Sequence, residues 1–499
     1  MSDLTFVLGL ALTVFMTVLF LQWLLQNKEK KYPKGPAGFP IVGHLPLFGK
    51  YPPKTFLKWW NSFGDVFSIR LGSWNTVVVN GYNAVKAAAE HPDDAFSGRP
   101  NFLTMEILSE RTKEDRLAFG NFSPVYLKQR KLASKALRMF TSKRSEVIEE
   151  LVTSETNVFV DILVKKYNRN AGLIELDVQT LVTKIIYQFL YGRGKTVEVE
   201  RHVKTIIEFL EEFNELSGNG SSLDVLPWLQ YIMPWKVEAI RKNTARSDDL
   251  VTEQVHQHYD TFVPGNIRDV ADAIIASDAD DEENKDRYVL TRARLNLTLA
   301  DLQDAGVDTT HKTLLWLFLY MAKFPDVQEK VFTEIKDIVG TNRSVMLKDK
   351  PELVFTNAVL LEVMRFVSQV PFSIPHYAMK NAKIQGFDVD KDTVVIFNLY
   401  SVHHEISFWG DPEIFRPERF ISDRKSLDKE KCNHIFAFGR GRRRCVGEIL
   451  AQMNLFISFS NVMQKCKFIK PADEQLHITP IPGLVYTPKP YKVLVQERN

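Results

Sequence analysis

One stretch near the C-terminal end decides how the chain is interpreted. It reads Phe438-Gly439-Arg440-Gly441-Arg442-Arg443-Arg444-Cys445-Val446-Gly447. A single cysteine follows a loop of glycines and arginines, and an apolar helical pattern begins directly after it. Gly441 and Gly447 allow tight or left-handed backbone beside the sulfur. The start of a helix carries positive partial charge, which favours the thiolate form of Cys445.

The fixed positions of this stretch form the pattern F-x-x-G-x-R-x-C-x-G, with Phe438, Gly441, Arg443, Cys445 and Gly447. Cys445 has no second cysteine at zinc spacing, so its thiolate suits a single axial bond to a haem iron. The pattern resembles the haem-ligand loop of the cytochrome P-450 (haem-thiolate monooxygenase) family. The resemblance implies a mainly α fold with a minor antiparallel β portion, in which haem b is buried between two long helices.

Length and composition limit the class of protein. The chain has 499 residues, of which 45% are hydrophobic and 25% charged, as in an ordinary globular protein with a large core. The net charge of +3 is too small to indicate a nucleic-acid partner. Three cysteines, an odd and small number, argue against a disulfide framework and favour a reducing compartment.

The N-terminal segment predicts a membrane anchor. Leu4 to Leu25 carries no charge and is long enough to span a bilayer, and lysines follow it at once. We therefore expect a single-pass signal-anchor over residues 1–27, a basic proline-rich hinge over 28–49, and one catalytic domain over 50–499 on the cytosolic side. Resemblance to animal microsomal members places this anchor in the endoplasmic reticulum membrane.

A second motif lies in a long helical pattern from about Thr291 to Phe324. It reads Ala305-Gly306-Val307-Asp308-Thr309. Glycine inside a helix costs about 1 kcal/mol relative to alanine, so a local opening of the hydrogen-bond ladder is expected at Gly306. The motif resembles the oxygen-activation motif of the family, which implies that Asp308 relays protons and Thr309 donates to dioxygen. An ordinary packed helix is the alternative.

Further residues are assigned around the haem. Glu362 and Arg365 share a helix face, and the resemblance implies that they form a structural triad with Arg419. For the haem propionates it implies three basic side chains and one aromatic one. These are Arg443, Arg130, His376 and Tyr126, the last standing where the family usually has tryptophan.

For several of these residues an ordinary structural role is the alternative to a functional one. His376 and Tyr126 could be ordinary core residues. His403 and His404 are expected to be surface histidines, because adjacent side chains point in different directions. A zinc site of Cys432, His434 and Cys445 lacks a fourth ligand and is disfavoured.

A basic face, expected around the Cys445 thiolate, indicates the kind of protein that delivers electrons. Its candidates are Lys128, Lys131, Lys135, Arg138, Lys431, Arg440, Arg442 and Arg444. Such a face would steer an acidic flavoprotein, although scattered solvated cations are the alternative. The resemblance implies electrons from NADPH through a flavin-containing reductase, with cytochrome b5 as a second candidate donor.

The substrate class follows only in outline. By resemblance the pocket walls come from Asn101–Gly120, Phe209, Phe213, Ala305, Thr309, Val370–Ile374 and Leu484–Tyr486. Most of these are apolar, so a steroid, fatty acid or aromatic xenobiotic is expected. Phe96–Pro100 and Asp224–Leu229 are most similar to the steroid 17-hydroxylase and aryl-hydrocarbon oxidising groups. Asp304 stands where those relatives usually carry glycine, and it either pairs with a neighbouring helix or meets a polar substrate group.

Three functions compete at this point. The first is a membrane-anchored haem-thiolate monooxygenase that inserts one oxygen atom into a hydrophobic small molecule. The second is a haem-thiolate isomerase or dehydratase acting on peroxides, against which the Asp308-Thr309 pair argues. The third is a non-catalytic haem- or lipid-binding membrane protein.

Overall fold

The computed structural model describes residues 31–108, 116–217, 221–279 and 291–498, together with Val14 and Thr17. Apart from these two residues, the expected membrane span Leu4–Leu25 lies outside the described part of the chain. No helix within that part combines the length and the apolar character needed to cross a bilayer.

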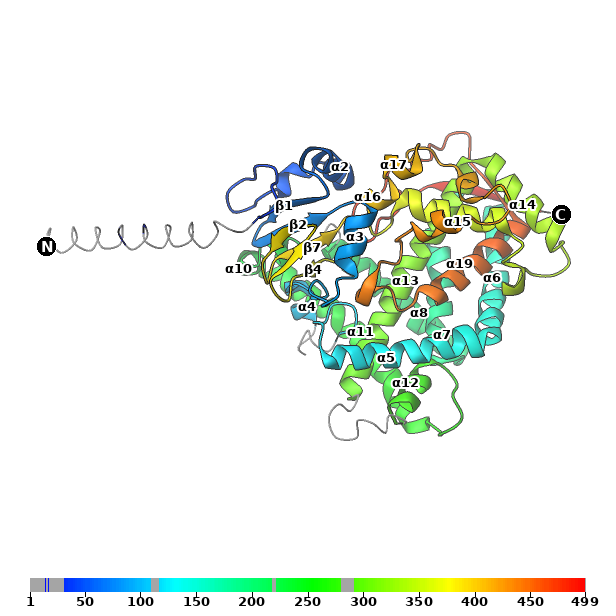
Figure 1. The fold of residues 1–499 in the computed structure, drawn as a ribbon. Coiled ribbons are helices and arrows are strands. Elements are labelled where there is room, and N and C mark those ends of the chain that lie inside the picture. Colours follow the sequence, from blue (N-terminus) through cyan, green and yellow to red (C-terminus); the bar gives the residue numbers. More distant parts are fainter. Residues whose placement is uncertain are drawn as a thin grey trace.

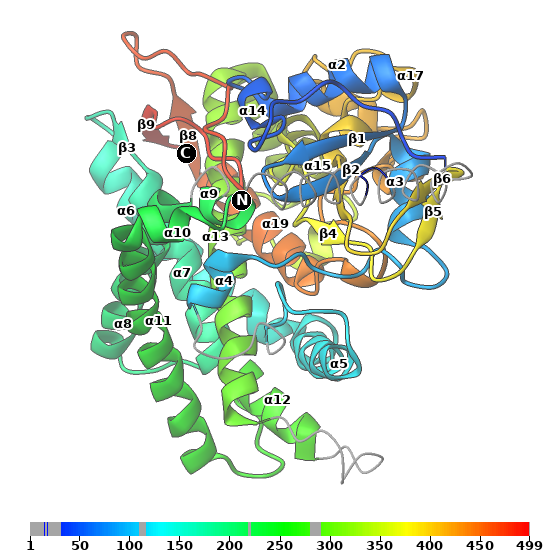
Figure 2. The same ribbon diagram turned by 90° about the vertical axis from the view of Figure 1, so that its left-hand side faces the viewer.

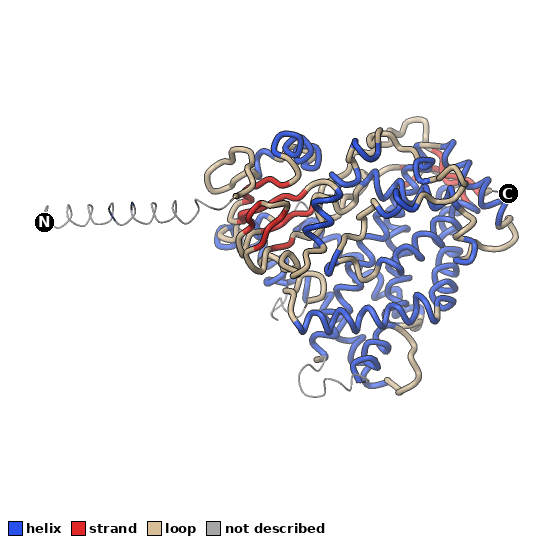
Figure 3. Tube along the Cα trace, viewed as in Figure 1, coloured by secondary structure: helices blue, strands red, loops and turns tan. Residues whose placement is uncertain are grey.

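Helices make up most of the molecule, and small sheets lie toward two of its edges (Figures 1 and 3). The helices are α2 (Pro52–Phe63), α3 (Tyr82–Ala89), α4 (Leu103–Leu108), α5 (Pro124–Arg138), α6 (Ser145–Tyr167), α7 (Glu175–Tyr191), α8 (Thr196–Ser217), α9 (Ser222–Val225), α10 (Leu229–Ile232), α11 (Pro234–Thr261), α12 (Val270–Ala279), α13 (Arg292–Lys323), α14 (Pro325–Ile338), α15 (Val354–Val367), α16 (Leu399–His403), α17 (Ile406–Trp409), α18 (Lys429–Asn433) and α19 (Glu448–Lys465). The expected mainly α fold is confirmed.

The longest helix, α13, runs through the middle of the molecule (Figure 2). The Thr291 hydroxyl caps its start by accepting from Arg294 N–H, and the helix ends before Phe324, as the sequence predicts. It packs against α7, α11, α14, α15 and α19. From Thr310 to Ala322 every residue is buried, because these helices surround the second half of α13.

The opening expected at Gly306 is absent, since α13 is a continuous helix through this residue. A Cβ atom on Gly306 would lie 3.4 Å from Ile186 Cδ1 of α7. That separation is tighter than most carbon contacts. Gly306 therefore lies in a continuous helix with Ile186 of α7 packed beside it, without a break in the hydrogen-bond ladder.

The main sheet has the strand order β1-β2-β7-β4, with β1 at Val66–Leu71, β2 at Trp74–Val79, β7 at Val394–Phe397 and β4 at His376–Tyr377. The β2–β7 pair is parallel, with Val77 opposite Val395, so this sheet is mixed rather than purely antiparallel. The remaining strands pair antiparallel: β5 (Ala382–Ile384) with β6 (Phe387–Val389), and β9 (Lys492–Glu497) with both β3 (Gly172–Leu173) and β8 (Cys466–Ile469). The expected minor β portion is confirmed, with one parallel pairing that was not foreseen.

The described part of the proline-rich segment lies against the main sheet. Ser68 N–H on β1 donates to Lys34 O at 3.0 Å. A Cβ atom on Gly35 would lie 1.7 Å from Ser68 O, so only glycine allows this approach. Lys31 N–H donates to Oδ2 of Asp388 on β6 at 2.7 Å, and Asp388 N–H donates to Lys31 O at 2.8 Å. These contacts fix the direction in which the chain enters the folded body.

Candidate active site

The loop before α19 is shaped so that the Cys445 side chain projects from a tight turn. Cys445 N–H donates to Phe438 O at 2.8 Å. Gly441 has φ +70°, and a Cβ atom there would lie 1.8 Å from Ala89 O at the end of α3. Glycine is therefore required at position 441 for two reasons: the positive φ angle and the close approach of the end of α3.

Gly447 serves differently from the expectation. Its φ is −90°, so the left-handed conformation is not used there. A Cβ atom on Gly447 would lie 4.0 Å from Cys445 Sγ, in ordinary van der Waals contact. Gly447 N–H forms a hydrogen bond to the Cys445 thiol, which lowers the thiol pKa. Gly447 thus acts on the sulfur through its N–H group at the start of α19.

The Cys445 thiol is surrounded by protein and is nevertheless accessible. Desolvation by the surrounding protein raises the pKa of its thiol overall. Its side chain is nevertheless exposed, whereas Cys466 is buried and Cys432 is only partly exposed. A thiol that is enclosed by protein and still accessible is available as a ligand.

Packing places the Cys445 loop beside α13. Val446 and Leu302 of α13 pack against the same apolar cluster, which contains Leu117, Tyr126 and Ala133. About one helical turn beyond Leu302, Ala305 is exposed, and about one turn further Thr309 is partly exposed. The two sequence motifs therefore come together across this cluster, on α13 and just before α19.

Thr309 and Asp308 are both held by hydrogen bonds. Thr309 Oγ1 donates to Ala305 O at 2.8 Å, while Thr309 O accepts from Gln369 Nε2 at 3.0 Å. Asp308 Oδ1 pairs with Lys312 Nζ at 2.6 Å and accepts from Asn214 Nδ2 at 3.1 Å.

The Lys312 partner was missed from the sequence. Its signal was the spacing i, i+4 from Asp308, at which opposite charges meet on a helix. The side chain of Lys312 is buried, so the ion pair with Asp308 is largely screened from water.

Arg443 lies at the centre of a cationic cluster. Its Nε donates to Ser97 O at 2.8 Å and its Nη2 to Gly120 O at 2.7 Å. The guanidinium carbon lies 4.0 Å from the ring centre of Tyr126, a cation–π contact with a tyrosine that is 1% exposed. Arg443 Nη1 is buried and has no hydrogen-bond partner among the residues described.

His376, Arg130 and Arg99 complete this cluster. His376 Nδ1 lies 2.7 Å from Phe96 O, and burial together with nearby Arg99 lowers the His376 pKa well below its usual value. Arg130 donates to Arg444 O. Arg99 donates to Ala118 O at 3.0 Å and to Ile374 O at 2.9 Å.

Arg99 was not singled out from the sequence, where Phe96–Pro100 served only for the comparison with the family. Burial, and then the charge of Arg443, lower the pKa of Arg99 well below its usual value. Cations that depress one another's pKa in this way indicate a site that an anionic group would stabilise.

The Glu362–Arg365–Arg419 triad forms behind this region. Glu362 Oε2 lies 2.7 Å from Arg365 Nε, and Glu362 Oε1 lies 3.1 Å from Arg419 Nε. Glu362 and Arg365 are 0% exposed, so the carboxylate depends on protein partners, which also include Arg416 N–H at 2.8 Å. Arg365 also donates to His403 O at 2.8 Å.

Comparison with known proteins identifies the family. The family model for Cytochrome P450 matches residues 33–495. The chain belongs to the cytochrome P450 family.

Relatives at 30% identity include cytochrome P450 1A1 of Cavia porcellus, over 97% of this chain and 95% of the relative, and that of Homo sapiens, over 92% and 90%. Cytochrome P450 1A2 of Mus musculus is 31% identical over 92% of this chain and 90% of the relative. This cytochrome P450 is accordingly a haem-thiolate monooxygenase, an oxidoreductase that uses haem iron with a thiolate ligand.

The residues of this cytochrome P450 fit the haem that its family implies. Haem requires one axial ligand and cations for two propionates. The accessible Cys445 thiol meets the first requirement. The buried Arg443 Nη1 without a partner, next to Arg99 and His376, meets the second.

The expectation that His403 and His404 are surface residues is wrong, since they are 1% and 4% exposed. His403 Nε2 accepts from Phe436 N–H at 2.9 Å, and its Nδ1 lies 2.8 Å from Ser368 Oγ. Because Arg365 donates to the His403 carbonyl, this histidine joins the triad to the start of the Cys445 loop. The prediction failed because these partners are distant in sequence.

Acid is expected to destabilise this protein through its buried histidines. Burial lowers the pKa of His403 to about 3 and that of His311 to about 4. In the unfolded chain these histidines titrate at about 6.5, so below that pH the unfolded chain binds more protons than the folded protein. The free energy of unfolding therefore falls with falling pH, by roughly 1.4 kcal/mol per pH unit for each histidine. Denaturant unfolding at pH 7 and 5 measures this loss.

The matched variants isolate the contribution of His403. His403→Gln should flatten the decline of unfolding free energy between the two pH values, whereas His256→Gln at an exposed site should leave it unchanged. Equal slopes in His403→Gln and the parent protein would show that His403 is not held neutral.

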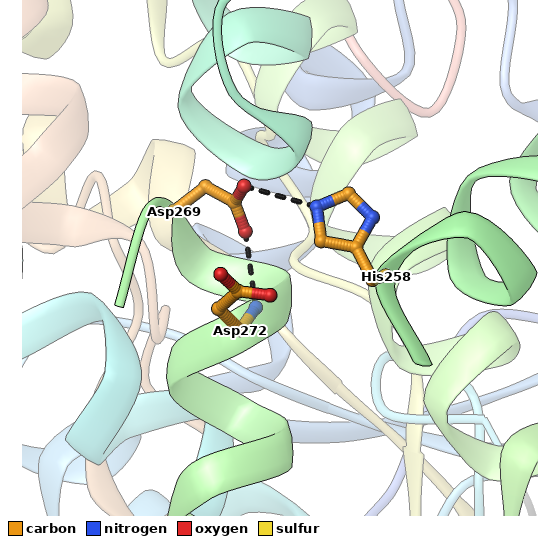
Figure 4. A group of neighbouring side chains, drawn as sticks. All are labelled: His258, Asp269 and Asp272. Carbon is orange, nitrogen blue, oxygen red and sulfur yellow. Dashed lines mark hydrogen bonds and ion pairs between the residues drawn. The ribbon is translucent and has the colours of Figure 1, made fainter. Parts of the chain in front are cut away.

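One group of described side chains has metal-like spacing: His258, Asp269 and Asp272 at the junction of α11 and α12 (Figure 4). His258 Nε2 lies 2.9 Å from Asp269 Oδ2. Arg268 donates to both oxygens of Asp272, at 2.6 and 2.9 Å. These carboxylates therefore already have partners, and the group acts as a buried polar contact between two helices.

A zinc site of Cys432, His434 and Cys445 was disfavoured from the sequence. In the part of the chain that the structure describes, these side chains form no metal-like group. The His434 ring is instead stacked on Phe408 with ring centres 3.6 Å apart.

Proposed function

We propose that this chain is a membrane-anchored monooxygenase that inserts one atom of dioxygen into a hydrophobic small molecule, with Cys445 as the axial ligand of haem b. One observation carries this proposal: an accessible thiol lies beside a buried cationic cluster in which Arg443 Nη1 has no partner. When bound, haem supplies oxygen activation, which thiolate donation to the iron promotes.

The roles of the surrounding residues follow from their contacts. We assign Arg443, Arg130, His376 and Tyr126 to the propionates, and Phe438, Gly441 and Gly447 to the shape of the thiolate loop. The small, exposed side chain of Ala305 keeps α13 free of bulk on the proposed haem side, and Gly306 follows it on the same helix.

Asp308 and Thr309 are proposed to move protons to the reacting oxygen. The Thr309 hydroxyl, now bonded to Ala305 O, would rotate to donate there, and the Asp308 carboxylate, now paired with Lys312, would take up a proton from solvent and pass it inward.

The substrate pocket is supported by an apolar cluster that joins distant segments. Phe102, Phe119, Phe213 and Ile374 all belong to it. The stacked rings of Phe209 and Phe213 lie 6.0 Å apart on α8. Tyr486 N–H donates to Gln369 O at 2.7 Å, which brings the C-terminal turn to the Val370–Ile374 segment. We infer a steroid, fatty acid or aromatic xenobiotic as substrate.

We propose that residues 1–27 anchor the protein in the endoplasmic reticulum membrane, with 28–49 as the hinge and 50–499 as the catalytic domain in the cytosol. The uncharged stretch Leu4–Leu25 and the lysines after it support this placement. Exposed Trp228, Tyr231 and Trp235 around α10 add an apolar surface of the kind that contacts lipid.

We propose electron delivery from NADPH through a flavin-containing reductase, with cytochrome b5 as a second donor. Lys131, Lys135 and Arg138 are exposed on one side of α5, whose Tyr126 and Arg130 contact the Cys445 loop. An acidic partner docking there would approach the thiolate side of the haem.

Charge reversal tests this docking face. Lys131→Glu with Lys135→Glu should lower the apparent association rate with the reductase by about tenfold at low salt, and high salt should narrow the difference. Stopped-flow reduction measures the rate. Lys336→Glu with Lys348→Glu, exposed lysines elsewhere, is the control. If both double variants were reduced at the same rate, this face of α5 would be excluded as the docking site of the reductase.

The function itself is tested by reconstitution with an NADPH-dependent flavoprotein reductase and a panel of apolar compounds. We expect substrate-dependent NADPH consumption and incorporation of isotopically labelled dioxygen into product. Turnover of a hydroperoxide without an electron donor, unaffected by Thr309→Ala, would instead indicate the isomerase or dehydratase class.

A further inference from the structure

The Asp308 carboxylate on α13 is held at one oxygen and left open at the other. Lys312 Nζ lies 2.6 Å from Asp308 Oδ1, and Asn214 Nδ2 donates to the same Oδ1 at 3.1 Å. Among the residues that the structure describes, none donates a hydrogen bond to Oδ2. The Asp308 side chain is 14% exposed, and Oδ2 does not count among the buried polar atoms without a partner. The two oxygens of this carboxylate therefore have different surroundings.

The two groups on Oδ1 come from different elements. Lys312 lies one helical turn along α13 and is 5% exposed, and Asp308 is its one ion-pair partner in the described part of the chain. A buried ammonium is unfavourable unless an opposite charge meets it, so Lys312 depends on Asp308. Asn214 belongs to α8 and follows Phe213, which packs against the apolar cluster assigned to the pocket wall. The carboxylate is thus fixed between the central helix and a helix of that wall.

This fixation matters because the last torsion of an aspartate side chain is soft. A turn about it exchanges the two oxygens, and the two contacts on Oδ1 oppose that turn. A group that transfers a proton must hold the proton within hydrogen-bond reach of the acceptor. Since Oδ1 is already occupied by two donors, a proton that Asp308 carries resides on Oδ2.

The other titratable groups near this pair leave Lys312 as the cation that faces Asp308. Burial lowers the pKa of His311 to about 4, so its imidazole is neutral at pH 7. On α7, burial and then Glu211 raise the pKa of Glu175, while Lys312 opposes them. The charge of Lys312 therefore acts on carboxylates of both α13 and α7.

We propose that Lys312 and Asn214 are positioning residues for proton delivery. They hold Asp308 Oδ1, so that Oδ2 is the atom that takes a proton from solvent and passes it toward the reacting oxygen. The proposal rests on the proposed function and names the atoms of its proton path. Each monooxygenation consumes two protons and two electrons and releases one oxygen atom as water. The reductase supplies the electrons, and solvent replaces each proton that leaves Oδ2.

A double-mutant cycle tests whether Lys312 acts through Asp308. The probe is whichever of progesterone, lauric acid and naphthalene the reconstituted parent oxidises. Lys312→Met should lower the product formed per NADPH by about tenfold, since a positioned acid contributes about 100 to 10,000-fold, and the remaining electrons should appear as hydrogen peroxide. In an Asp308→Asn background, where the amide oxygen still accepts from Lys312, the same change should cost less than about twofold.

Substrate affinity separates positioning from damage to the pocket. The spin-state titration of Lys312→Met with the same probe should stay within about twofold of the parent, because Lys312 touches Asp308 and not the pocket cluster. Lys204→Met, which removes an exposed ion pair of the same spacing with Glu208 on α8, is the matched control and should behave like the parent.

A second variant covers the case in which Lys312→Met does not fold, as judged by the thiolate-type spectrum of the reduced, carbon-monoxide-bound protein. Asn214→Ala leaves no buried charge unpaired. It should lower the product formed per NADPH by about threefold, and only when Asp308 is present.

Denaturant unfolding of the same four proteins gives a measure that is independent of turnover. The unfolding equilibrium constants of the parent, Lys312→Met, Asp308→Asn and the double variant should show a coupling of at least about twofold.

Losses of product that multiply in the double variant, or parent-like product formation in both Lys312→Met and Asn214→Ala, would overturn the proposal. Absence of coupling in the unfolding cycle would do the same. Absence of any oxygenated product in the parent would instead refute the proposed function, whatever the unfolding cycle shows.

Discussion

Replacement of Cys445 by serine is expected to abolish monooxygenation and the thiolate-type spectrum of the haem. Serine keeps the size of the side chain and the loop geometry set by Gly441 and Phe438. Its hydroxyl does not supply the thiolate that binds iron and promotes oxygen activation. We expect product formation to fall by more than about 100-fold, since changing only the partners of a metal ligand already costs 10 to 100-fold. Product formation and haem content of the purified variant measure the effect.

The other two cysteines provide controls for this change. Cys432→Ser and Cys466→Ala should keep the spectrum and the turnover, because neither residue belongs to the Cys445 loop. A Cys445→Ser protein that retained a thiolate-type spectrum would show that another residue ligates the iron.

The largest loss of stability is expected from Arg365→Ala. This change leaves the Glu362 carboxylate, which is 0% exposed, without its closest cation. It also removes donors to His403 O and Pro412 O. Breaking a buried ion pair by removing one partner costs about 3–5 kcal/mol, so we expect a loss of that size in the free energy of unfolding. Denaturant unfolding followed by haem absorbance measures it.

Two comparisons sharpen this prediction. Arg365→Lys should recover only part of the loss, because lysine lacks the planar fork that contacts both oxygens of Glu362. Lys330→Ala removes an exposed ion pair with Glu418 and should cost less than about 1 kcal/mol. A cost for Arg365→Ala similar to that of Lys330→Ala would mean that the triad does not support the fold.

Local patterns predicted the elements that carry the chemistry. The extent of α13 follows from its capping threonine and periodicity, and its observed bounds agree closely with the expected Thr291 to Phe324. The β-branched residues between Val66 and Val79 are likewise typical of the two strands that form there. The position of Cys445 just before an apolar helix could be predicted, because all the residues that set it lie within a few positions of the cysteine.

Features that depend on distant segments were not predicted. His403 is buried because Phe436 N–H and Arg365 find partners on it, and no local pattern indicates either contact. Arg99 joins the cationic cluster through carbonyls near Ile374 that lie far along the chain. Gly306 was attributed to an opening in the helix, whereas α13 is continuous there and Ile186 of α7 packs beside it. Each of these depends on tertiary packing, which the chain's local periodicity does not encode.

The proposal that Cys445 ligates the haem iron is tested most directly by the absorption spectrum of the reduced, carbon-monoxide-bound protein. A Soret band of the thiolate type is predicted for the parent protein and should be absent from Cys445→Ser. A band of the imidazole type in the parent, or a thiolate-type band that survives in Cys445→Ser, would contradict the assignment.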